Sequence, residues 1–218
     1  MQKARDNKRI NRSRACGHFG TSMNNRSDAV ILHVIRLWRD EAKMRTDPQI
    51  IDELAQRKTR DRLVPDQSLL AGDTQTISMK SIHNAEKRLG FEIPKLLVEI
   101  YTKIANGGFG ESYGLLGLIG GPVNEDGLDA VSLCESYREP DPTDEYWKWP
   151  EKLLPICHLG CAMYHCVQCD EKKSPIILFE PNPHEEDEPW DNSFIPFCES
   201  LNHYMSAWID DVDLWGNV

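Results

Sequence analysis

The chain has 218 residues, 40% of them hydrophobic and 28% charged, which is the balance of a soluble globular protein. Its net charge of −10 is unevenly divided, because residues 1–62 carry 15 Lys and Arg against 8 Asp and Glu, whereas residues 63–218 carry 10 against 27. A body this acidic repels nucleic acid and attracts basic partners, so we expect no direct nucleic-acid binding by the main domain.

The N-terminal third, residues 1–75, is predicted to lie outside the main domain. Residues 1–27 place Lys and Arg among Asn, Ser and Gly with almost nothing apolar to bury, which predicts a disordered basic tail. Such a tail can contact nucleic acid, but it is more often a solvated segment. Residues 28–75 are predicted to form a helical extension and a linker, with one helix beginning at Asp28 and a second, shorter one at Asp47-Pro48.

Residues 76–218 are predicted to form the main domain, and its first elements are helices. Ser78 can cap a helix that ends at Leu89, with Gly90 as its left-handed stop. Pro94 then stands in the first turn of a second helix. The buried stripe of this second helix is predicted from five apolar residues at helical spacing: Leu96, Leu97, Ile100, Tyr101 and Ile104.

Glycines punctuate the segment that follows. Asn106-Gly107-Gly108 is predicted to end the second helix as a C-cap, since Gly supplies a positive φ, although the same residues can also form a backbone nest for an anion. Leu115–Ile119, which follows Gly114, is predicted to be a short strand.

Downstream the apolar period changes to that of strands. Leu153–His158, Ala162–Gln168 and Pro175–Glu180 are predicted strands, the last two joined by a polar turn. Apolar residues at helical spacing from Phe197 to Ile209 predict a closing helix. Helices around hairpin-linked strands indicate a single α+β domain, with a mostly antiparallel sheet flanked by helices and an N-terminal helical extension.

One continuous block, AEKRLGFEIPKLLVEIYTKIANGGFG followed by YGLLGL, resembles the Smi/Knr-type family of the SUKH superfamily. The resemblance rests on a Leu-Gly helix end, an Ile-Pro helix start and an Asn-Gly-Gly turn before a Gly-Leu segment, and it extends over about two-thirds of the chain, Thr76–Trp215. The motif residues are structural: Pro94, Asn106, Gly107, Gly108, Gly114 and Leu115.

The resemblance implies an α+β binding module. Bacterial members are similar to immunity proteins that bind and neutralise polymorphic toxins, often nucleases, and fungal members resemble scaffolds in cell-wall and signalling control. No catalytic residues come with the family, so we expect no enzymatic activity and no cofactor.

An acidic run after two prolines is the candidate partner-binding site. It can imitate a phosphate backbone for a basic protein surface, or it can be an ordinary solvated loop. Its residues are Glu185, Glu186, Asp187, Glu188, Trp190 and Asp191. Asp210, Asp211 and Asp213 are candidates for an extension of this acidic face. Tryptophans near acidic residues are typical of binding hot spots, or they cover the edge of a small core.

A cysteine cluster is the alternative chemical signal. Cys157, Cys161, Cys166 and Cys169 stand close together in the chain with two histidines, and thiols with imidazoles can hold zinc. Their spacing differs from two C-x2-C pairs separated by a dozen or more residues, and cysteine packs readily as a small hydrophobic side chain. They remain weak candidates, and we expect no metal.

The sequence favours a non-enzymatic protein-binding module of the immunity type, whose partner is a cognate bacterial toxin domain. The alternatives are a regulatory scaffold of the same fold and, less favoured, a zinc- or thiol-dependent protein. Spanning a bilayer takes about 20 apolar residues, and the longest apolar run is interrupted by His33 and Arg36, so we expect no membrane partner. Seven cysteines are an odd number without an export signal, which predicts reduced thiols and a cytoplasmic location.

Overall fold

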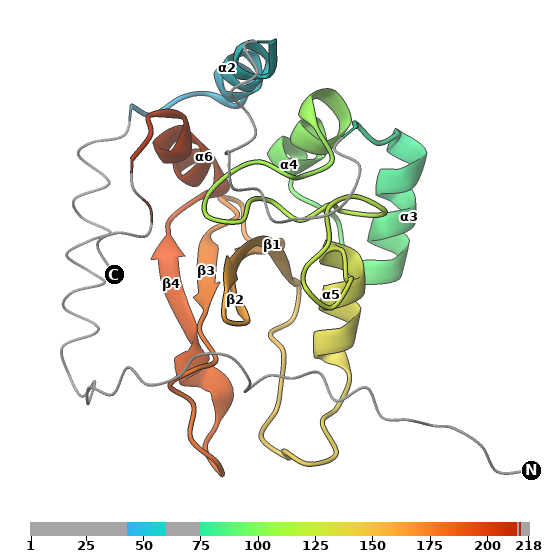
Figure 1. The fold of residues 1–218 in the computed structure, drawn as a ribbon, viewed down its shortest axis with the longest axis vertical. Coiled ribbons are helices and arrows are strands. Elements are labelled where there is room, and N and C mark those ends of the chain that lie inside the picture. The colour runs from blue at the N-terminus through green and yellow to red at the C-terminus, as the bar shows by residue number, and fades with distance from the viewer. Residues whose placement is uncertain (1–42, 60–74, 213, 215–218) are drawn as a thin grey trace, which may run out of the picture.

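The computed structural model describes residues 43–59, 75–212 and 214 (Figure 1). The tail 1–27, the helix predicted from Asp28 and residues 60–74 of the linker therefore lie outside the described residues; Lys43, at the predicted end of that helix, is described and is not helical. In chain order the elements are α2 (Asp47–Thr59), α3 (Met79–Leu89), α4 (Lys95–Glu99), η1 (Ile100–Ile104), α5 (Ala130–Arg138), β1 (Leu153–Gly160), β2 (Met163–Gln168), β3 (Ile176–Phe179), η2 (Trp190–Ser193), β4 (Phe194–Cys198) and α6 (Leu201–Ile209).

The four strands form one antiparallel sheet in the order β1-β2-β3-β4, so each strand pairs with its neighbour in the chain. Figure 1 shows α3 and α5 beside the β1 edge and α6 beside β4, and contacts join α5 to β1, α3 to α5 and α6 to β4. The prediction of a single α+β domain with an antiparallel sheet flanked by helices is confirmed. Within the described ranges, no helix has the length and apolar character needed to cross a bilayer.

The first helix of the main domain is bounded as its sequence predicts. The Ser78 hydroxyl accepts the backbone N–H of Ser81 at 3.2 Å, and Gly90 ends α3 in the left-handed conformation at φ 78°. Ile82, Ala85 and Leu89 form its buried face. The bounds and the buried face of α3 could be predicted because caps and apolar stripes depend on residues within one or two turns of the helix.

The second helix begins after Pro94 as predicted, and its apolar stripe is buried, but its second half is π-helical. The predicted positive φ at Gly107 and Gly108 is confirmed, at 85° and 80°, but these glycines are not the helix cap, because the helix ends at Ala105 in an extended conformation, φ −162°. Gly107 serves close packing as well. A Cβ at Gly107 would stand 2.6 Å from the carbonyl oxygens of Leu115 and Leu116.

The strand predicted over Leu115–Ile119 is also wrong, since only Leu115 makes a bridge, to Cys157 of β1. The segment leaves β1 because the Asn106 side chain takes its backbone groups. Asn106 Oδ1 accepts the N–H of Leu118 at 2.9 Å, and its Nδ2 donates to the carbonyl of Ile119 at 3.0 Å. A strand cannot continue where a side chain has replaced the ladder partner.

Helix α5, the short η2 and strand β4 were not predicted from the sequence. Helix α5 has a local signal, since Asp129 caps it by accepting the N–H of Ser132 at 2.8 Å. Strand β4 takes Phe197 from the predicted closing helix, which begins only at Leu201 with Ser200 as its cap. Phe197 continues the helical spacing by coincidence, and the strand around it was decided by long-range pairing, in which its neighbours Pro196 and Cys198 pair with Ile177 and Ile176 of β3.

Candidate functional site

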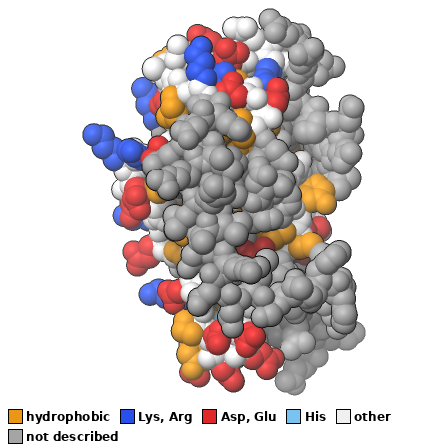
Figure 2. Space-filling view, turned by 90° about the vertical axis from the view of Figure 1, so that its left-hand side faces the viewer, with side chains coloured by type: hydrophobic (Ala, Val, Ile, Leu, Met, Phe, Trp, Pro, Cys, Tyr) orange, Lys and Arg blue, Asp and Glu red, His pale blue; other side chains and the backbone are white. Residues whose placement is uncertain are grey.

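The acidic loop, residues 181–191, connects β3 to β4. It carries five carboxylates and no Lys or Arg, and the four side chains Glu185–Glu188 are exposed. In Figure 2, acidic side chains gather at the lower end of the molecule, the end at which the β3–β4 connection lies in Figure 1. The loop therefore presents hydrogen-bond acceptors to solvent, which suits a surface of Lys and Arg side chains.

Trp190 is buried, at 8% exposure, and lies at the start of η2. Its ring stacks on His184 with centroids 3.6 Å apart, and its Nε1 donates to Asp144 Oδ2 at 2.7 Å. This places Trp190 at the edge of the core, one of the two roles that the sequence left open. His184 precedes the run Glu185–Glu188 and Trp190 follows it, so the stacking of the two rings brings the ends of the run together and orders the loop.

Asp144 brings a second acidic loop to the same place. The second loop, residues 139–147, joins α5 towards β1 and carries four carboxylates with no Lys or Arg. Tyr146 lies on it with 41% of its surface exposed, and among the described residues it is the one exposed Phe, Trp or Tyr side chain. Sequence reasoning missed this loop, although its acidic and proline-rich composition, EPDPTDEYW, resembles that of the acidic loop, EEDEPW.

Aromatic packing beneath the two loops fixes them to each other. The Trp147 and Trp190 rings meet edge to face with centroids 4.9 Å apart, and Trp147 Nε1 donates to the Tyr137 carbonyl at 2.8 Å. Phe179, at the end of β3, lies 5.1 Å from the Trp149 ring and 5.6 Å from the Tyr137 ring. Such ring pairs prefer these tilted geometries, so the loops rest on a packed base. Trp215 lies outside the described residues.

Asp210 and Asp211 do not extend this acidic face. Asp210 pairs with Arg45 at 2.6 Å and Asp211 with Arg57 at 3.2 Å, so the basic extension neutralises both. The hydrogen bond from Arg45 holds the pKa of Asp210 below its ordinary value. Asp213 lies outside the described residues.

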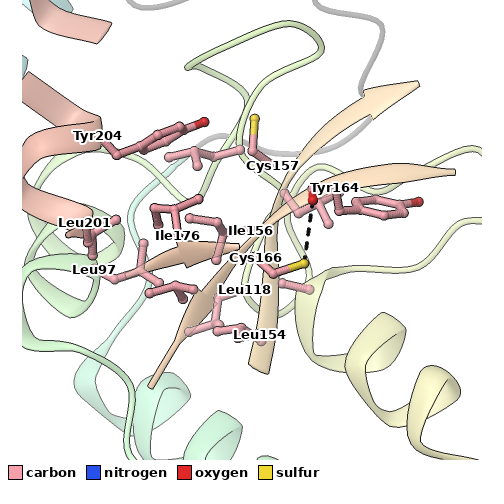
Figure 3. Packing of buried hydrophobic residues seen from close by; sticks show 14 of the residues in the cluster. Leu97, Leu118, Leu154, Ile156, Cys157, Tyr164, Cys166, Ile176, Leu201 and Tyr204 are labelled. Carbon is pink, nitrogen blue, oxygen red and sulfur yellow. Dashed lines mark hydrogen bonds between the residues drawn. The ribbon is translucent and has the colours of Figure 1, made fainter. Parts of the chain in front are cut away.

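The candidate thiols are mostly packed into the core (Figure 3). Cys166 lies among apolar side chains and its Sγ donates to the Tyr164 carbonyl at 3.7 Å, while Cys157 Sγ donates to the Glu111 carbonyl at 3.2 Å. Burial raises the pKa of Cys157 to about 12 and raises that of Cys166 and Cys169 as well. Cys161, in the turn after β1, is partly exposed.

Metal ligation needs several side chains converging on one point. Across the ranges that the structure describes, no three His, Cys, Asp or Glu side chains are grouped so that they could hold a metal ion. Cys157, Cys166 and Cys169 thus have the surroundings of packed side chains, which was the other interpretation of the pattern, whereas Cys161 does not.

The structural motif residues build the support of β1. Gly107, Gly108 and Gly114 have positive φ angles of 85°, 80° and 94°, and the N–H of Gly108 donates to the Leu115 carbonyl at 2.7 Å. This bond uses the N–H that an anion nest would need. These residues therefore fold the segment between η1 and α5 against the sheet.

An antiparallel α+β fold with an acidic two-loop surface has the features of a module that binds other proteins. Residues 76–207 match the family model described as SMI1 / KNR4 family (SUKH-1). The chain therefore belongs to this family, which is generally non-enzymatic and comprises protein-binding modules of the immunity or regulatory type. A search of curated proteins found no match.

Proposed function

We propose that this protein is an immunity-type module that binds and neutralises a cognate bacterial toxin, a nuclease being the kind of toxin that its charge suits best. The family supports a protein-binding role. The observation that carries the finer proposal is the two-loop surface, residues 139–147 and 181–191, which joins nine carboxylates without a Lys or Arg. Nuclease active sites must attract phosphates and are therefore basic, which makes an acidic plug complementary to them.

Neutralisation by this surface is an occlusion mechanism. The carboxylates of Glu185, Glu186, Asp187, Glu188 and Asp191 attract the basic face of the toxin and speed the encounter. Exposed Tyr146 supplies an aromatic contact of the kind that fixes specificity at interface centres. Because Trp190 and Asp144 already order the loops, little conformational entropy is lost on binding.

We place this activity in the cytoplasm, where a toxin with an intracellular target would be met. The buried thiols of Cys134, Cys157 and Cys166 suit a reducing compartment. The proposed mechanism gives no role to the basic segment 1–27.

Co-expression tests the proposal directly. Each toxin domain encoded beside the gene is expressed alone and together with the full chain, and growth is measured. We expect one domain to inhibit growth alone, to be tolerated with the chain, and, in a catalytically inactive form, to co-purify with it. Failure of every neighbouring domain to co-purify, with no rescue of growth, would contradict the toxin partner and leave the regulatory-scaffold alternative.

A further inference from the structure

Helix α2 and its two acidic partners, Asp210 and Asp211, lie outside the family match. The match covers 76–207, whereas α2 spans Asp47–Thr59 and its charged partners are Asp210 and Asp211. Figure 1 shows α2 beyond α6 at the end of the molecule opposite the acidic loop. The additions at the two ends of the family domain thus pair with each other.

The N-terminal side of α2 is attached by one carboxylate. Arg45 grips Asp210 in a bidentate pair, Nη2 to Oδ1 at 2.6 Å and Nη1 to Oδ2 at 3.0 Å, and the backbone N–H of Lys43 donates to the same Oδ2 at 2.8 Å. Paired, charge-assisted bonds of this geometry are among the strong hydrogen bonds of proteins.

The C-terminal side of α2 is attached by Arg57. This guanidinium reaches Asp211 Oδ1 at 3.2 Å, donates to the Ile209 carbonyl and lies over the Trp208 ring, 5.2 Å from its centroid. Lys58 next to it donates to the carbonyl of Ile104, the last residue of η1. At both ends of α2, basic side chains of the α2 segment therefore contact the C-terminal ends of α6 and η1. Cations are favoured at the C-terminal ends of helices.

Between these attachments the contact is part apolar and part polar. Ile50, Ile51 and Leu54 are the three buried apolar side chains of α2, and they belong to the same hydrophobic cluster as the rest of the core. The α6 face that meets it carries Asn202, which donates to Asp47 at 2.8 Å, and Ser206, whose carbonyl accepts from Arg45 at 3.2 Å. A 13-residue helix is marginal in water on its own, so α2 keeps its form through docking.

We propose that α2 is a releasable clasp, which docks on α6 through the Arg45–Asp210 and Arg57–Asp211 pairs and detaches as a unit while the sheet stays folded. Release uncovers the Trp208–Ile209 end of α6 and the end of η1. This device does not depend on the toxin partner, because every contact in it is within the chain. A basic ligand that competes for Asp210 and Asp211 would open it.

Hydrogen exchange of the full chain tests the clasp. In the Asp210→Asn, Asp211→Asn double variant we expect amides of α2 to exchange roughly tenfold faster or more, with β2 and β3 unchanged. The Asp52→Asn, Glu92→Gln double variant is the matched control, since it removes the same two charges from exposed positions, one of them on α2 itself. The Arg45→Gln, Arg57→Gln double variant breaks the same pairs from the other side and should give the same result.

Two outcomes would overturn the clasp. One is unchanged exchange of α2 in both double variants, which would show that the apolar contacts alone hold it. The other is faster exchange of α2 only together with the strands, which would show that α2 is an inseparable part of the core.

Discussion

Trp190 donates its indole N–H to the carboxylate of Asp144 at 2.7 Å, although the two residues stand 46 positions apart in the chain. Through this bond the loop before β4 and the loop after α5 become one surface. Most of the carboxylates that make the surface acidic, Glu185–Glu188 among them, are exposed, whereas Trp190, which orders them, is buried at 8% exposure. The candidate site therefore depends on the fold, which brings the two loops together, as well as on the acidic run Glu185–Glu188.

The coupling between Trp190 and Asp144 can be measured with a double-mutant cycle. Trp190→Phe keeps an aromatic ring but removes the donor, and Asp144→Ala removes the acceptor. We expect the two changes to be non-additive by about 1–2 kcal/mol in the free energy of unfolding, since the acceptor is charged and the site partly buried. Urea unfolding of the four proteins gives the value, and additivity to within about 0.5 kcal/mol would contradict the role given to this bond.

Gly107 and Gly90 provide a matched pair that separates close packing from backbone strain. Both have positive φ, 85° and 78°, but a Cβ at Gly107 meets two backbone oxygens at 2.6 Å, while one at Gly90 meets nothing within 4 Å. Gly90→Ala should cost about 1 kcal/mol from the left-handed conformation alone. Gly107→Ala should cost about 3 kcal/mol or more, because backbone atoms must move. Equal losses in denaturant unfolding would show that φ alone requires the glycines.

His165 makes stability depend on pH. It is fully buried, its Nδ1 lies 3.0 Å from the Tyr204 hydroxyl, and burial lowers its pKa to about 3, against an ordinary 6.5. Between these values the unfolded chain binds a proton that the folded chain does not, so stability falls as pH drops below 6.5 and continues to fall towards 3. The contribution of one such group is at most about 1.4 kcal/mol per pH unit.

His165→Gln should remove most of that slope, measured as the free energy of unfolding between pH 7 and about 5. Some slope remains from His158, whose pKa burial also lowers. The exposed His83→Gln is the control and should leave the slope as it is. An unaltered slope in His165→Gln would mean that this imidazole is protonated in the folded protein.

The core cysteines should be slow to react. A thiol whose pKa is about 12, as burial makes those of Cys134 and Cys157, is ionised in fewer than about one molecule in ten thousand at pH 7.5. Iodoacetamide should label Cys161, which is partly exposed, well before Cys134, Cys157 or Cys166, as read by peptide mass spectrometry. Labelling in guanidinium, where all should react, is the control. Equally fast labelling of Cys157 in the native protein would revive the thiol-dependent alternative.

The parts of the fold that local chemistry decides could be predicted from the sequence. Ser78 and Gly90 bound α3 because a cap acts within one turn, and the stripe from Leu96 to Ile104 is buried because helical spacing brings it to one side. The segment after Leu115 could not be predicted, since Asn106 takes its backbone groups from twelve residues earlier in the chain. No local pattern contains that contact.

The site divides in the same way. The acidity of Glu185–Glu188 is a fact of composition, and its exposure follows from the cost of burying unpaired charge. The burial of Trp190 and the arrival of Asp144 depend on where two distant loops end, which the sheet and α5 decide. The charge of Asp210 predicted that it would extend the acidic face, but the structure pairs it with Arg45 instead. The two residues come from opposite ends of the chain, so no local pattern predicts the pair.

Titration calorimetry with the co-purifying toxin domain tests the central claim most directly. The loop variant changes Glu185, Glu186 and Glu188 to Gln and Asp187 to Asn; the matched control makes the same changes at Glu92, Glu151, Glu171 and Asp52, all exposed and outside both loops. We predict that Kd rises by about tenfold or more in the loop variant, with a weaker salt dependence, and stays within about twofold in the control. Equal affinities of the two variants would contradict binding through the acidic loop.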